Sequence, residues 1–176
     1  MKTPRAIAGL TLTTILAAVL TANLGAAFAA PAPGGDVRKA LQADYSDRDG
    51  AVARKDVGGT LAHYAPDFVG VSHTGKAHDI KEERADFVKT FTTLNIRSDV
   101  SRSAIQALAL GKGGTEAQVT LRRHGVLLIA NPQTRLNGVL VLDGVYQDTW
   151  AKRSGAWLLT REQEKTIKAT MNGLPL

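Results

Sequence analysis

The sequence predicts an α+β domain in which three N-terminal helices cover one face of a curved, mostly antiparallel sheet. Apolar residues recur at helical spacing in the first part of the chain, and from Ile96 onward they follow a period of two. Helices followed by a run of strands are typical of the α+β class. With 176 residues, of which 44% are hydrophobic, the chain can form one domain with a substantial core.

The N-terminus has the pattern of an export signal. Lys2 and Arg5 precede an apolar stretch, and Ala27-Phe28-Ala29 then places small residues at a cleavage position. We therefore expect residues 1–29 to be a cleaved signal peptide and residues 30–35 a flexible leader, so that the mature domain is exported, either periplasmic or secreted. The alternative is an uncleaved membrane anchor, but interspersed threonines dilute the hydrophobicity of this stretch.

The first two helices are predicted from caps and apolar spacing. Asp36 can cap a helix whose apolar stripe includes Val37, Leu41 and Tyr45. Asp56 can cap a second, short helix, which Pro66 is expected to end because its ring cannot continue the helical hydrogen bonds. Residues 68–73 then have the pattern of a strand, and a turn follows at residues 74–75.

A third helix and four long strands complete the predicted domain. Asp79, with Glu82 three residues on, forms a variant of the capping box at the start of the helix. The period-two segments lie near residues 96–110, 115–130, 138–152 and 156–165. Asp143-Gly144 in the third segment is either a bulge or an extra tight turn.

No internal boundary divides the predicted domain, which covers residues 36–167. Residues 168–176 form a C-terminal tail without clear periodicity. Seven large side chains fall on the predicted apolar faces and should be largely buried: Tyr45, Leu61, Phe68, Phe87, Phe91, Trp150 and Trp157.

Composition narrows the possible functions. Lys2 and Arg5 leave with the signal, so the mature chain keeps 20 basic against 16 acidic residues, a formal charge of +4. The charges are scattered and the aromatic residues few, so we expect no nucleic-acid partner. The chain has no cysteine, which excludes disulfides and a lipoprotein anchor, and we expect no stable membrane anchor after signal cleavage.

Three passages of the sequence resemble one fold family. They are Lys55-Asp56-Val57 through Leu61-Ala62-His63-Tyr64-Ala65-Pro66-Asp67-Phe68-Val69, then Gly75 ahead of the third helix, and Tyr146-Gln147-Asp148-Thr149-Trp150 through Trp157-Leu158-Leu159. Together with the order of elements, they resemble the nuclear transport factor 2-like superfamily of cystatin-like α+β cones, especially its SnoaL-like branch. The resemblance implies a pocket between helices and sheet, and a homodimer formed through the sheet. One scaffold serves several chemistries in this family, so function has to come from the site.

The resemblance also suggests catalytic candidates. Ketosteroid isomerase in this family, which is a standard example of tuned carboxyl groups, uses a carboxylate base, a Tyr and a protonated Asp that holds an oxyanion. Ser72 stands at the position of the base and cannot replace a carboxylate. Asp148 stands at the position of the oxyanion-stabilising Asp, and Tyr45 lies about one helical turn from the position of the Tyr.

A further candidate, His73, and the candidate Asp148 each have an alternative interpretation. His73 could serve as a base near neutral pH, but strand alternation directs it away from Ser72, which favours an exposed or turn-capping histidine. Tyr146, Asp148 and Trp150 share one face of a strand, so Asp148 is either a pocket acid among aromatics or a carboxylate bonded to an arginine, Arg122 or Arg123.

The sequence thus predicts a pocket with two sets of candidate residues. The catalytic candidates are Asp148, Tyr45 and His73, and the pocket candidates are Tyr64, Phe68, Ser72, Tyr146 and Trp150. The four histidines lack metal-binding spacing, so neither a metal nor another cofactor is expected. We expect an exported domain that binds a small, largely apolar molecule; the alternatives are a lyase or isomerase of the ketosteroid isomerase or SnoaL type, and a non-catalytic structural module.

Overall fold

The computed structural model describes residues 34–93, 96–130 and 137–176. The predicted signal peptide and residues 30–33 of the leader lie outside these ranges. Among the described residues, no helix is long and apolar enough to cross a membrane. In chain order the elements are α1 (Gly35–Ala53), α2 (Val57–Thr60), β1 (Tyr64–Val71), β2 (Ala77–Asp79), α3 (Ile80–Thr93), β3 (Ile96–Leu110), β4 (Glu116–Ala130), β5 (Asn137–Arg153), β6 (Ala156–Met171) and β7 (Leu174–Pro175).

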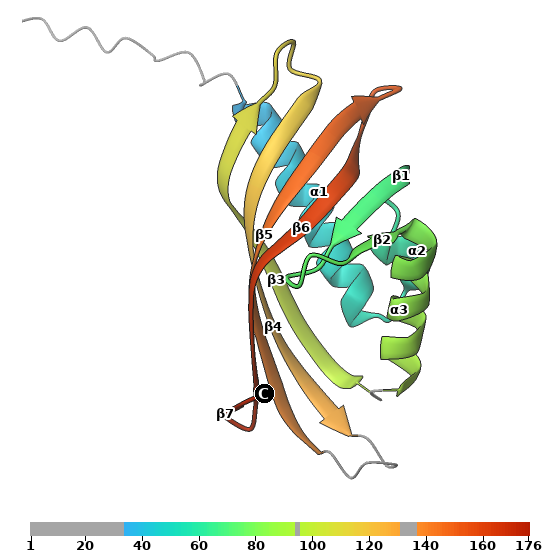
Figure 1. Cartoon of the computed structure of the whole chain (residues 1–176), viewed down its shortest axis with the longest axis vertical. Coiled ribbons are helices and arrows are strands. Elements are labelled where there is room, and N and C mark those ends of the chain that lie inside the picture. The colour runs from blue at the N-terminus through green and yellow to red at the C-terminus, as the bar shows by residue number, and fades with distance from the viewer. Residues whose placement is uncertain (1–33, 94–95, 131–136) are drawn as a thin grey trace, which may run out of the picture. The chain divides into compact units, whose positions relative to one another are not determined.

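The strands form one curved sheet in the order β2-β1-β6-β5-β4-β3, with β7 paired to β6. All neighbouring strands are antiparallel except β1 and β6, which run parallel. The long strands β3 to β6 bend along their length, and α1 packs beside β3 (Figure 1). The predicted α+β class with a mostly antiparallel sheet is confirmed.

The four predicted period-two segments correspond to β3, β4, β5 and β6. Their ends agree closely except in β6, which continues to Met171, so residues 168–176 contain the end of β6 and all of β7. Asp143-Gly144 makes no tight turn, because it lies inside β5 and pairs with Lys168 and Ile167. The sheet irregularity comes one step later, between Val145 and Tyr146, where the register of β5 against β6 shifts.

Two predictions about the N-terminal helices were wrong. α1 starts two residues earlier than predicted, with Gly34 at the cap position, and Asp36 lies in the first turn without acting as the cap. α2 ends at Thr60 rather than at Pro66, because Gly58 and Gly59 lower the helical propensity of this segment. The predicted cap of α2 is confirmed, since Asp56 accepts a hydrogen bond from the Gly59 amide at 2.9 Å.

The strand that follows α2 starts at Tyr64 instead of Phe68. Tyr64 pairs with Leu159 of β6, and pairing resumes only at Val69. Pro66 lies in the irregular stretch between these points, where its missing amide hydrogen costs no ladder hydrogen bond. The turn at residues 74–75 and the capping box of α3 are as predicted: Asp79 and Glu82 each accept a hydrogen bond from the backbone amide of the other.

The core consists of two clusters along the inner face of the sheet. The first joins α1, α2 and β1 to the sheet and contains Tyr45, Phe68 and Trp150. The second lies towards the other end of the long strands and contains Ile96, Leu127, Ile129 and Leu140. Five of the seven side chains predicted to be buried are buried.

Phe87 and Phe91 are only half-buried, which corrects the prediction for α3. No residue of this helix is fully buried. α3 contacts β1, β2 and α2 but does not lie flat on the long strands. Ile80 and Phe87 pack against the first core cluster and Phe91 against the second, so the apolar face of α3 is only partly covered.

Candidate functional site

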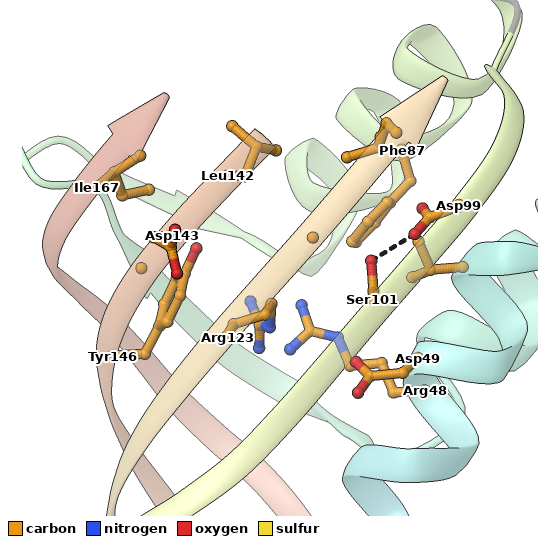
Figure 2. A pocket seen from close by; sticks show the side chains of 14 residues that line it. Arg48, Asp49, Phe87, Asp99, Ser101, Arg123, Leu142, Asp143, Tyr146 and Ile167 are labelled. Atoms are coloured by element: carbon orange, nitrogen blue, oxygen red, sulfur yellow. Dashed lines mark hydrogen bonds between the residues drawn. The ribbon is translucent and has the colours of Figure 1, made fainter. Parts of the chain in front are cut away.

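A cavity of about 200 Å³ lies between the two core clusters. Its apolar wall comes from α1, α3 and the strands, and consists of Val52, Phe87, Leu127, Leu142 and Ile167. Figure 2 shows Phe87 and Leu142 at one end and two guanidinium groups, of Arg48 and Arg123, side by side at the other. The cavity thus has an apolar body and a charged end.

The charged end is built on a buried carboxylate. Arg48 of α1 and Arg123 of β4 both donate to Oε2 of Glu162, at 2.8 and 3.1 Å. Burial alone would raise the pKa of Glu162, but the two guanidinium groups outweigh it and hold this pKa at about 2. Glu162 is therefore ionised at neutral pH, and it fixes the position of both arginines.

Aromatic rings and a hydroxyl complete the support of the arginines. The Arg48 guanidinium lies 5.2 Å from the centre of the Tyr64 ring, and that of Arg123 lies 4.2 Å from the centre of the Tyr146 ring. Arg123 Nε also donates to Ser103 Oγ at 3.4 Å. These contacts orient planar donors towards the cavity.

Gly144 makes room for the Tyr146 ring. A Cβ atom at position 144 would lie 2.6 Å from Cε2 of Tyr146, so any side chain there would displace the ring. Tyr146 lines the cavity and packs on Arg123. The glycine of the Asp143-Gly144 pair therefore has a role in the shape of the site.

Asp148 and Tyr45 do come together, but beneath the cavity and not in its wall. Tyr45 donates to Asp148 Oδ2 at 2.6 Å and accepts from Trp150 Nε1 at 2.8 Å. Asp148 is fully buried, and its Oδ1 has no partner within the described residues. Burial, with a smaller contribution from the Glu162 charge, raises the pKa of Asp148 to about 7.

Neither Arg122 nor Arg123 bonds to Asp148. Arg123 bonds to Glu162, which lies directly across from Asp148 on β6. Arg122 lies at the surface and reaches Asp143 at 3.4 Å. Asp148 is therefore a buried, hydrogen-bonded acid to which no basic side chain of the described residues bonds.

The remaining predicted residues lie in three places. Tyr146 lines the cavity. Tyr64, Phe68 and Trp150 lie in the first core cluster, where they are not in the cavity wall. Ser72 and His73 lie where β1 turns into β2: the Ser72 hydroxyl bonds that of Thr74, and exposed His73 bonds Glu164.

Of the described residues, three acidic ones line the cavity, Asp49, Asp99 and Asp143, and Asp99 has the fewest partners. Ser101 Oγ donates to Asp99 Oδ1 at 2.5 Å, as the dashed line in Figure 2 indicates. Asp99 Oδ2 is buried and has no partner in the described part of the chain. Burial raises the pKa of Asp99 above its ordinary value.

Sequence reasoning missed Arg48, Glu162 and Asp99. Arg48 lies three residues after Tyr45 and seven after Leu41, so helical spacing alone places it on the buried face of α1. Glu162 gave no such signal, because the register of β6 against β5 slips between Leu159 and Arg161. Across residues 34–93, 96–130 and 137–176 no group of acidic and histidine side chains could hold a metal ion.

Comparison with known proteins supports the fold. No protein-family model and no curated protein sequence matches this chain. Among solved structures, a candidate scytalone dehydratase from Novosphingobium aromaticivorans DSM 12444 is similar, with a TM-score of 0.61 and 16% identity, over 76% of this chain and 83% of the other.

Two further structures agree. The hexachlorocyclohexane dehydrochlorinase LinA-type3 from Novosphingobium barchaimii LL02 has a TM-score of 0.56 and 16% identity, over 80% of this chain and 90% of the other. An NTF-2-like protein of unknown function from Shewanella oneidensis MR-1 has a TM-score of 0.55 and 14% identity, over 72% of this chain and 96% of the other. The fold is that of nuclear transport factor 2-like proteins, as the resemblance in the sequence implied.

Proposed function

We propose that this chain, which has the nuclear transport factor 2-like fold, is an exported domain that binds a small, largely apolar molecule in the cavity under α3. The observation that carries the proposal is a cavity of about 200 Å³ with apolar walls and a fixed polar end. A largely apolar cavity with a few oriented polar groups is the usual form of a small-molecule site. The space also argues against a purely structural module, whose interior would be filled by its own side chains.

The arrangement of Asp148 and Tyr45 favours binding over catalysis by these two residues. A Tyr and a protonated Asp could hold an oxyanion only if both reached the ligand. Here their polar atoms bond each other in the closed core, and neither residue lines the cavity. They stabilise the wall beneath the ligand instead.

A cavity-filling variant tests the binding function. Leu142→Trp should occupy the apolar end and abolish binding of 2-phenylethanol, which we would follow by NMR line broadening of the probe. Val139→Trp is the matched control, because Val139 lies on the same strand, is 40% exposed and does not line the cavity. Equal binding by the two variants would place the probe elsewhere and contradict the proposal.

A lyase or isomerase remains the second candidate, and Asp99 is the observation that favours it. This carboxylate is in the cavity wall, its Oδ2 has no partner among the described residues, and burial raises its pKa towards the range of a general base. In deuterium oxide such a base would take a proton from the carbon next to the carbonyl of phenylacetone and return a deuteron. Exchange by the wild type that Asp99→Asn abolishes would support an enzyme, and exchange that the variant leaves unchanged would exclude Asp99 as the base.

Export and dimerisation complete the proposal. Protein from the extracytoplasmic fraction should begin at or near Ala30, and an N-terminus that keeps Lys2 would favour an anchor.

The outer face of the sheet carries exposed Val100, Leu128 and Val139, which a second copy would cover. Light scattering should give a dimer for the wild type and a monomer for Leu128→Lys, whereas a monomeric wild type would remove dimerisation.

A further inference from the structure

We propose that the molecule bound in this cavity carries a carboxylate, which the paired guanidinium groups of Arg48 and Arg123 bind. This inference rests on the proposed binding function and adds the chemical class of the ligand. Both arginines line the cavity and lie side by side in it (Figure 2). A planar guanidinium pair is the arrangement that recognises a carboxylate through several charge-assisted hydrogen bonds.

The two arginines carry more positive charge than their shared partner removes. Both donate to the same oxygen of a single carboxylate, Glu162. Burial and repulsion from Arg123 lower the pKa of Arg48, and Glu162, Tyr64 and Glu83 together raise it by more. One negative charge between two guanidinium groups leaves an attraction for a second anion.

The arginines also keep hydrogen-bond donors for a ligand. Each guanidinium has five N–H donors. Arg48 uses Nη1 on Glu162, while Arg123 uses Nη2 on Glu162 and Nε on Ser103. Within the described ranges, Nη2 of Arg48 and Nη1 of Arg123 donate to no protein atom, so a ligand oxygen could accept from both.

Among the described residues, the other carboxylates in or near the cavity form hydrogen bonds with groups other than the two arginines. Asp49 accepts from the backbone amide and the hydroxyl of Ser103, at 2.6 and 2.9 Å. Asp143 bonds Arg122 and His124 at the surface. Glu83 bonds His78 at 2.8 Å and does not line the cavity, although its charge contributes to raising the pKa of Arg48. For Asp99, burial opposes ionisation.

The remaining wall of the cavity indicates which class of carboxylic acid it can bind. Away from the arginines the wall is largely apolar, with Asp99 and Ser101 among the polar exceptions, and the cavity volume is about 200 Å³. An apolar body with one acidic head matches this division, whereas a sugar phosphate would leave its hydroxyls against apolar side chains. We therefore infer a small organic acid with a largely apolar body.

Three probes with the same body and different heads test the inference by calorimetric titration of the mature protein. They are phenylacetate, 2-phenylethanol and 2-phenylethylamine, with an anionic, a neutral and a cationic head. Phenylacetate should bind at least about ten-fold more tightly than the alcohol, as expected for hydrogen bonds to charged groups. Equal binding by acid and alcohol, or tightest binding by the amine, would overturn the carboxylate while the binding function stands. Binding by none of the three would remove both.

Variants of single residues test whether the arginine pair causes the preference for phenylacetate over 2-phenylethanol. Arg123→Gln should lose the preference for phenylacetate and still bind 2-phenylethanol, while the control Arg122→Gln, on the outer face of the same strand, should keep it. If Arg123→Gln does not fold, Glu162→Gln gives a second test. In the Glu162→Gln variant, phenylacetate should take the place of the lost carboxylate, so it should raise the melting temperature of this variant more than that of the wild type. An equal or smaller rise in the variant would refute the arginine pair as the binding site of phenylacetate.

Discussion

Removing the charge of Asp148 should stabilise the protein at high pH. The Asp148→Asn variant keeps an oxygen that accepts from Tyr45, and it cannot ionise. In the wild type, burial raises the pKa of Asp148 from 3.8 to about 7, so the folded state holds a proton that the unfolded chain releases. The wild type is therefore stabilised below pH 4, and this stability is lost as the pH rises to about 7. Asn does not suffer this loss.

The size of the effect follows from the two pKa values. The difference between 3.8 and about 7 corresponds to roughly 4 kcal/mol in the free energy of unfolding. At pH 4 the variant and the wild type should be almost equally stable, because both then have a neutral side chain at this position. At pH 8 the variant should be the more stable by up to about 4 kcal/mol.

Urea unfolding at pH 4 and pH 8 measures this difference. Asp143→Asn on the same strand is the control, because His124 and Arg122 hold the pKa of Asp143 below its ordinary value of 3.8, so its difference in stability from the wild type should be nearly the same at pH 4 and pH 8. Equal destabilisation of Asp148→Asn at both pH values would refute the reasoning. It would mean that Asp148 is ionised and paired in the folded protein.

Three further results are expected from the packing and the buried charges. Phe87→Ala should lower the free energy of unfolding, measured by thermal unfolding, by ~2 kcal/mol, about half the loss for a fully buried Phe. Val88→Ala, at an exposed position of the same helix, should lower it by almost nothing. A loss of about 4 kcal/mol or more for Phe87→Ala would mean that α3 closes the cavity. Gly144→Ala should cost about 1–3 kcal/mol by displacing the Tyr146 ring, and little in a Tyr146→Ala background; equal costs in both backgrounds would exclude that clash. Stability should fall by roughly 3 kcal/mol between pH 4.5 and 2 as Glu162 takes up a proton, and Glu162→Gln should not show this fall; an unchanged acid profile in that variant would disprove the role of Glu162.

Hydrophobic periodicity predicted most of the fold, because the sheet is built from four long strands with regular alternation. The N-terminal elements were harder, since α2 is a single turn with two glycines and β1 contains a proline. Phe87 and Phe91 were predicted to be buried because periodicity identifies the apolar face of a helix. It does not report whether that face meets side chains or a cavity.

The candidate site was predicted in part. The resemblance and strand alternation brought Tyr45 and Asp148 together, and the structure has them in contact. Sequence alone could not predict that Glu162 faces inward. Trp157 and Leu159, two residues apart, both face inward, so regular alternation would turn the side chain of residue 162 outward. The register shift after Leu159 reverses this and brings Glu162 to the inner face. The buried charge at the end of the cavity therefore needed the register of β6.

The most direct test of the account is where a bound acid lies. Methyl NMR spectra of the mature protein, recorded with increasing phenylacetate, report contacts along both faces of the sheet. We predict shifts in the methyl signals of Leu127, Leu142 and Ile167, which line the cavity, and none for Leu128 and Val139 on the outer face. Shifts confined to the outer face, or no shifts at all, would contradict the claim that this cavity is the binding site.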